Sequence, residues 1–276
     1  MSGPTADIAV IGGSGFYRFL DDVTELPVHT PYGPPSAPVA LAPVGDRTVA
    51  FLPRHGQHHE YPPHRVNSRA NLWALRQLGV RRVIGPFAAG SLRADIHPGE
   101  LVVCDQLIDR TWGRPDTFLD GPVLGHASFA DPYCPELGDV LSQAAGDIGA
   151  VAHRSGTVMV IQGPRFSTRA ESRWFRNAGC DVINMTQYPE AALARELGIC
   201  YGGLAQITDY DTGLEGDASI EPVTMEAAFA VLEASVDQTR RLLMKAIPAI
   251  PDVPSCACAE GVAGGPLADG PRDEAD

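Results

Sequence analysis

The chain lacks any apolar run long enough to cross a membrane, and it lacks an excess of positive charge. None of its 276 residues lies in a stretch approaching the roughly 20 apolar residues that a membrane-spanning helix requires. The short polar start, residues 1–7, does not resemble an export signal, so we expect a cytoplasmic protein. The formal net charge of −13 disfavours nucleic acid and anionic membranes as partners.

Several common catalytic and metal-binding motifs are also missing. The sequence contains no Gly-x-Ser-x-Gly, no His-Glu-x-x-His and no P-loop lysine. His58, His59 and His64 are separated by two prolines that break any helical register, which disfavours a metal site. The pair Cys256 and Cys258 has no further paired ligand following it, so we expect a feature of the tail with redox chemistry left open.

Apolar strands alternate with amphipathic helices along the chain, a pattern typical of α/β proteins. We expect one domain over residues 1–250, with a sheet flanked by helices and made mixed by a hairpin turned at Gly45 and Asp46. The segment 251–276 is rich in Pro, Gly and acidic residues and predicts a disordered tail. The expected strands are 7–11, 37–44, 47–53, 80–89, 101–108, 156–161, 181–185 and 199–207; the expected helices are 66–78, 136–148, 168–178, 189–197 and 223–247.

Two carboxylates end the apolar run that begins at Leu204. Asp209 and Asp211 would lie at the carboxyl end of a strand, where open α/β sheets bind their ligands. A carboxylate accepts a proton from an exocyclic amine, and its acid form donates to a ring nitrogen, which are the two contacts that adenine requires. A solvated turn explains the same residues, and the motif alone does not decide between the two interpretations.

Candidate anion-binding residues follow other expected strands. Gly12 to Gly15 with the Ser14 hydroxyl can cradle an anion or form a plain tight turn. Arg54 can clamp a phosphate beside His55, or it can be a surface residue beside a packed histidine. Thr186 can bind phosphate or cap the helix that follows.

An aromatic residue and a run of small residues complete the set. Phe166, at a sharp turn before a helix, can stack on a planar base or belong to the core. Small residues from Ala88 to Gly90 let a ligand approach the backbone, or merely form a tight turn. With no nucleophile in evidence, these residues favour a transfer reaction in which bound phosphate attacks.

The order of these motifs resembles that of the 5′-methylthioadenosine phosphorylases, which belong to the trimeric branch of the purine nucleoside phosphorylases. The likeness runs from about residue 7 to residue 247, and the Gly163–Glu171 and Asn184–Glu190 segments match most specifically. The resemblance implies a purine nucleoside phosphorylase-like fold, inorganic phosphate as co-substrate, no cofactor or metal, and a homotrimer. It leaves open whether trimers pair into hexamers.

The resemblance also implies roles for individual residues. Asp209 and Asp211 would be catalytic and contact the adenine amine and N7, and His126 would reach the 5′ pocket of a neighbouring subunit. Base and ribose contacts would come from Phe166, Met185 and Tyr210. The residues that would hold phosphate are Ser14, Arg54, His55, Phe87, Ala88 and Thr186. Many relatives have Thr where this chain has Phe87, which puts that contact in doubt.

Three positions bear on specificity. Related phosphorylases that act on inosine and guanosine have Asn at the position of Asp209. They also have a His at about the position of Met225, where it contacts a 5′-hydroxyl. Asp209 therefore favours 6-amino purines, and an apolar Met225 suits a methylthio group; Ser167 is a further candidate. The implied reaction is phosphorolysis of 5′-methylthioadenosine. The alternatives are phosphorolysis of adenosine or of 6-oxopurine nucleosides, and a non-catalytic nucleotide-binding protein that uses Gly12 to Gly15.

Overall fold

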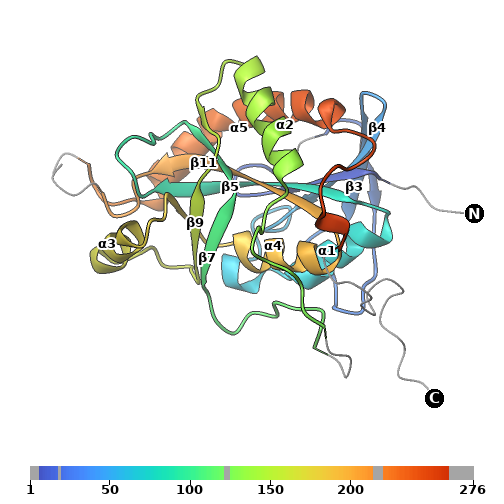
Figure 1. The fold of residues 1–276 in the computed structure, drawn as a ribbon, viewed down its shortest axis with the longest axis horizontal. Coiled ribbons are helices and arrows are strands. Elements are labelled where there is room, and N and C mark those ends of the chain that lie inside the picture. Colours follow the sequence, from blue (N-terminus) through green and yellow to red (C-terminus); the bar gives the residue numbers. More distant parts are fainter. Residues whose placement is uncertain (1–5, 18–19, 121–124, 214–219, 261–276) are drawn as a thin grey trace, which may run out of the picture.

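The computed structural model describes residues 6–17, 20–120, 125–213 and 220–260 (Figure 1). None of the helices in these ranges combines the length and apolar character that a membrane span requires. The strands are β1 (Ile8–Gly12), β2 (Thr24–Leu26), β3 (Val39–Val44), β4 (Arg47–Pro53), β5 (Arg82–Ser91), β6 (Leu101–Cys104), β7 (Gln106–Arg110), β8 (Ala152–His153), β9 (Thr157–Ile161), β10 (Val182–Asn184) and β11 (Cys200–Asp209). The helices are α1 (Ser68–Gln77), α2 (Pro135–Asp147), α3 (Arg169–Asn177), α4 (Gln187–Glu196) and α5 (Met225–Ala249), with short 3-10 turns at Pro63–Arg65 and Cys258–Glu260.

All the strands belong to one mixed sheet, which confirms the expected α/β architecture. The main path runs β2-β3-β4-β1-β5-β10-β9-β7, and β11 joins β5 to β6, which in turn pairs with β8. Strands β4, β1, β5 and β11 are mutually parallel, so their carboxyl ends reach the same edge of the sheet. β10 crosses that edge antiparallel to β5, pairing Ile183 with Gly90.

Helices cover both faces of this sheet. In Figure 1, α2 and α5 lie on one side of β5 and β11, and α1 and α4 lie on the other. β1 shows how the sequence builds the two apolar layers, because its side chains alternate between them: Ile8 and Val10 join the cluster with α2 and α5, and Ala9 and Ile11 the one with α1 and α4.

One expected strand is in fact two. Residues 101–108 were predicted as a continuous strand, but β6 pairs with β11 and β7 pairs with β9. The chain changes partner at Asp105, whose backbone N–H donates to the carbonyl of Gly156 at 3.2 Å and whose Oδ1 accepts the Gly156 N–H at 3.0 Å. These bonds satisfy the backbone where the ladder breaks, which no apolar pattern reveals.

The first part of the expected tail lies against the domain. The Arg82 side chain donates to the Pro251 carbonyl at 2.7 Å, Ser255 N–H donates to Glu136 at 2.8 Å, and Cys258 is buried. Residues 251–260 therefore pack against the domain, because two small thiol side chains supply an apolar anchor within a polar segment. The remainder of the expected tail, 261–276, lies outside the described residues.

Candidate functional site

A cavity of about 310 Å³ opens at the edge where the parallel strands end. Its size and mixed lining suit a small molecule. It brings together residues predicted separately from distant motifs: Ser14, Arg54, His55, Phe87, Ala88, Phe166, Met185, Thr186, Asp209, Asp211 and Met225. The two carboxylates therefore face the same space as the candidate anion-binding residues.

Both carboxylate oxygens of Asp209 are held by the chain. Oδ2 accepts the Thr208 hydroxyl at 2.6 Å, and Oδ1 accepts the Asp211 backbone N–H at 2.7 Å. Burial raises the pKa of Asp209, and these two hydrogen bonds only partly oppose the rise. Asp209 is thus fixed in orientation and retains a proton more readily than an exposed aspartate.

Asp211 presents an oxygen that lacks a partner. The residue is 3% exposed, and its Oδ2 has no hydrogen-bond partner among the described residues. Its φ of 52° lies in the left-handed region, which Asp tolerates better than most side chains and which turns it into the cavity lining. Burial raises its pKa, opposed by the neighbouring Ser172 and Ser167 hydroxyls, so Ser167 lies behind Asp211 rather than on the cavity wall. The Asp211 carboxyl group therefore lines the cavity with little water around it, where its ionised form would favour a ligand that donates.

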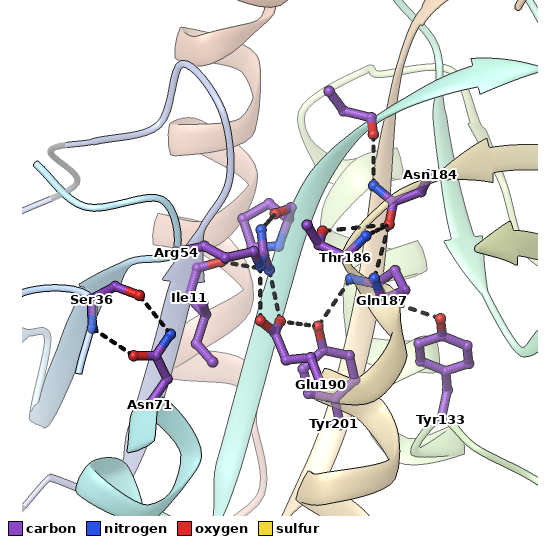
Figure 2. A network of polar contacts seen from close by, with 12 residues as sticks. Ile11, Ser36, Arg54, Asn71, Tyr133, Asn184, Thr186, Gln187, Glu190 and Tyr201 are labelled. Carbon is purple, nitrogen blue, oxygen red and sulfur yellow. Dashed lines mark hydrogen bonds and ion pairs between the residues drawn. The ribbon is translucent and has the colours of Figure 1, made fainter. Parts of the chain in front are cut away.

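Arg54 is bound mainly to the protein itself. It is fully buried, and its Nε and Nη2 donate to the two carboxylate oxygens of Glu190 at 2.8 and 2.7 Å. Nη1 and Nη2 also donate to the Pro86 and Ile11 carbonyls at 3.0 and 3.1 Å (Figure 2). Glu190 outweighs the effect of burial and raises the pKa of Arg54. The expected two-point phosphate clamp is therefore filled by Glu190, which leaves one of the five guanidinium N–H groups for a ligand.

A buried polar network extends from this ion pair and was not expected from the sequence. The Tyr201 hydroxyl donates to Glu190, Gln187 Nε2 donates to the Tyr201 oxygen at 3.0 Å, and the Tyr133 hydroxyl donates to Gln187 Oε1 at 3.0 Å (Figure 2). Gly85 makes room for it, because a Cβ there would lie 2.1 Å from the Tyr201 hydroxyl oxygen. The network joins β4, α4 and β11 behind the cavity and fixes where Arg54 lies.

His55 is a neutral acceptor. Its Nδ1 lies 2.8 Å from the Tyr61 carbonyl oxygen, which can only accept, so Nδ1 carries the proton and Nε2 has the free lone pair. Burial, with Arg54 nearby, lowers the pKa of His55 to about 4. The ring stacks on His59 with centroids 4.6 Å apart. Such an imidazole suits a ribose hydroxyl or a protonated phosphate oxygen better than a phosphate dianion.

Asn184 organises the start of α4 at the cavity. Its Oδ1 accepts the backbone N–H groups of Thr186 and Gln187 at 2.6 and 2.9 Å, while its Nδ2 donates to the Ala88 carbonyl at 3.0 Å (Figure 2). The side chain of Thr186 makes no capping bond, although the residue is the N-cap of α4. Asn184 takes the capping role. The Thr186 hydroxyl makes only one long hydrogen bond, donating to Asn184 Oδ1 at 3.4 Å, and it lies in the cavity lining at a helix amino end, where anions are favoured.

One wall of the cavity is apolar. Phe166 is 41% exposed there, and Met225 at the start of α5 is 59% exposed. Phe229 and Leu232 line the same wall and were missed from the sequence, although their spacing from Met225 places all three on one helix face.

Two predicted residues, Tyr210 and His126, lie outside the cavity lining, and a third, Phe87, lines it with a packed side chain. Tyr210 points away from the cavity, with its hydroxyl 2.6 Å from His97 Nδ1, because neighbouring residues at a strand end face opposite sides. His126 is exposed in the long loop after β7. Phe87 lines the cavity but is 1% exposed and belongs to the core. Its side chain therefore packs against apolar neighbours and offers no hydroxyl group to a ligand.

Comparison with known proteins agrees with this geometry. The phosphorylase superfamily profile matches residues 7–247. The S-methyl-5′-thioadenosine phosphorylase of Mycolicibacterium smegmatis is 53% identical over 244 residues, covering 88% of this chain and 91% of the relative. The purine nucleoside phosphorylase of Streptomyces coelicolor is 50% identical, covering 94% and 95%.

A solved structure shows the same fold. The methylthioadenosine phosphorylase of Schistosoma mansoni, in complex with adenine, superposes with a TM-score of 0.85 at 36% identity, covering 89% of this chain and 92% of that one. The chain belongs to the phosphorylase superfamily, within its methylthioadenosine phosphorylase family.

Proposed function

We propose that the protein catalyses phosphorolysis of 5′-methylthioadenosine to adenine and 5-methylthioribose 1-phosphate. The observation that carries this proposal is that two carboxyl groups, Asp211 and the tethered Asp209, line the cavity side by side. An adenine amine would satisfy Asp211, whereas the carbonyl of a 6-oxopurine would place a second acceptor against it. The names of the curated relatives support the same substrate.

In the proposed reaction the C1′–N9 bond breaks and its electron pair moves into the purine. Asp209 donates a proton to N7, or holds one already bound there, and its raised pKa favours either role. A phosphate oxygen attacks C1′ and forms the new C1′–O bond. Because phosphate lies beneath a sugar that gains positive charge, its negative charge stabilises that state.

Phosphate binding is proposed at the opposite end of the cavity from the base. The remaining Nη1 donor of Arg54, the Ser14 and Thr186 hydroxyls and the amino end of α4 supply donors. A Cβ on Gly13 would lie 3.0 Å from Arg54 Nη1, so the glycine keeps the approach to that donor open. The reaction needs no cofactor, since phosphate itself is the nucleophile.

The apolar wall would receive the methylthio group. Met225 and Phe229 offer soft, adaptable apolar surface for that group. The exposure of Met225 at the cavity rim supports a further proposal, that a neighbouring subunit of a homotrimer covers this wall and contributes His126. Light scattering of the purified protein tests the trimer and shows whether trimers pair.

A substrate panel tests the proposed function. Purified enzyme is assayed for base release from methylthioadenosine, adenosine and inosine, with and without phosphate. We expect phosphate-dependent adenine release, fastest from methylthioadenosine, and a loss in Asp209→Asn much larger than any change in thermal stability. Cleavage of inosine without cleavage of methylthioadenosine would support the 6-oxopurine alternative and refute the proposal. Binding of a dinucleotide without any turnover would favour the non-catalytic alternative.

A further inference from the structure

Four cysteines from distant parts of the chain meet at the amino end of β11. The sulfur atoms of Cys134, Cys200, Cys256 and Cys258 all lie within 4.8 Å of one another. Cys134 precedes α2, Cys200 begins β11, and the other two belong to the segment after α5. The expectation that no further ligands accompany Cys256 and Cys258 is wrong, because the fold brings Cys134 and Cys200 beside them from far earlier in the sequence.

We propose that this four-cysteine cluster binds a structural Zn²⁺ ion. Zinc–thiolate bonds of about 2.3 Å in a tetrahedron place the sulfur atoms roughly 3.8 Å apart. The Cys200 and Cys256 sulfur atoms are 3.4 Å apart, and the other pairs fall within the 4.8 Å limit. Small rotations of four side chains would therefore complete the tetrahedron without moving the backbone.

Two features beside the cluster suit the negative charge of a zinc tetrathiolate. Cys134 is the N-cap of α2, and Arg195 lines the same cleft as Cys134 and Cys258. Helix amino ends and nearby guanidinium groups stabilise thiolates. A cleft of about 410 Å³, lined by Cys134, Cys258, Asp105 and Asp139, gives an ion a route to the sulfur atoms.

Binding requires no further reactant. Each thiol releases its proton to solvent as its sulfur bonds to the ion, and no electrons are transferred. Pairing the same cysteines as disulfides would need an oxidant to take two electrons for each bond. Four protein ligands leave no open position, which is typical of structural rather than catalytic zinc.

The position of the cluster indicates what the ion would do. Cys200 and Asp209 are nine positions apart in β11, about 30 Å along an extended strand, so the ion would not reach the reacting atoms. It would instead fasten the segment 251–260 to α2 and to the start of β11. This gives a polar segment a fixed place despite its small apolar surface.

Metal analysis of the full-length protein tests the proposal. The chain is purified with a phosphine reductant and without chelator, and its zinc content is measured by inductively coupled plasma mass spectrometry. We expect about one zinc per chain, and close to none in Cys256→Ser/Cys258→Ser. Cys180→Ser is the matched control, because Cys180 is buried in a separate cluster, and it should retain the ion.

Two further measurements on the unmodified chain keep the proposal open to refutation even if the variants fail to fold. Cobalt titration of the metal-free protein should give the absorption typical of a tetrahedral cobalt thiolate. Zinc addition should raise Tm by several degrees and slow proteolysis within 251–260. The proposal is overturned if the reduced protein takes up neither ion. It is equally overturned if alkylation without reductant shows these cysteines paired as disulfides in zinc-free, fully folded protein.

Discussion

The backbone N–H of Asp211 donates to Oδ1 of Asp209 at 2.7 Å, so the two residues that face the cavity also fix each other. Their functions can nevertheless be separated, because both oxygens of Asp209 accept a short hydrogen bond from the chain, whereas Oδ2 of Asp211 does not. Asp211→Asn replaces one carboxylate oxygen by an amide NH2 group, which donates hydrogen bonds, and Asn tolerates the left-handed backbone conformation of this residue. We expect kcat/KM for methylthioadenosine to fall about 10–100-fold, as for loss of a hydrogen bond to a charged group. Steady-state kinetics with inosine as second substrate should show a smaller loss; equal losses would contradict the assignment.

Gly90 is expected to be required for the position of Asp209. A Cβ at residue 90 would lie 2.8 Å from Asp209 Oδ1 and 3.1 Å from the Ile183 side chain. Gly90→Ala should therefore displace the carboxylate and lower kcat by at least about tenfold, with a loss of roughly 1–3 kcal/mol in unfolding free energy from overpacking. Gly146→Ala, in α2 with open space around its Cβ, is the control and should leave kcat unchanged. A fully active Gly90→Ala enzyme would show that Asp209 needs no fixed orientation.

The buried Arg54–Glu190 pair predicts a large loss of stability when one member is neutralised. Glu190→Gln keeps the shape of the side chain and leaves Arg54 as an uncompensated buried charge, which should lower the unfolding free energy by about 3–5 kcal/mol. Denaturant unfolding measures this. Asp21→Asn removes the partner of Arg240 in an exposed pair and should have no measurable effect. Similar stabilities for the two variants would mean that the network does not hold Arg54.

His55 predicts a pH dependence of stability. Its pKa is about 4 in the folded protein and 6.5 when unperturbed, so the unfolded chain binds more protons between these values. Its contribution is complete above pH 6.5 and is lost as the pH falls toward 4, by about 3 kcal/mol in total. Unfolding measured across this range should show a shallower slope in His55→Gln than in the parent. His126→Gln, which alters an exposed histidine, should keep the parent slope.

The sequence indicates the edge of the sheet at which the site forms, but not how the site is supported. Polar residues following apolar strands placed Asp209, Ser14 and Arg54 at one edge, because parallel strands bring their carboxyl ends together. The partner of Arg54 lies 136 positions away at Glu190, and no local pattern connects them. Because the sequence does not reveal this partner, the Arg54 guanidinium group was predicted to bind phosphate at two points.

Two other differences have the same physical origin. The direction of Tyr210 follows from the course of the chain at the end of β11, where the pairing with β5 shifts register, and the change of partner at Asp105 depends on which strands are neighbours. Periodicity predicts that a strand exists, whereas its neighbours follow from tertiary packing. The four-cysteine cluster is likewise invisible to spacing rules, since its members come from three separate elements.

The continuity of β11 limits how this sequence can change in length. The strand runs without a break from the cysteine cluster at Cys200 to the carboxylate at Asp209. Because side chains alternate along a strand, inserting or deleting a single residue between them would turn Asp209 to the other face of the sheet unless a second bulge restored the register. We therefore expect length variation to be rejected within β11, which a library of single-residue insertions and deletions selected for activity would reveal.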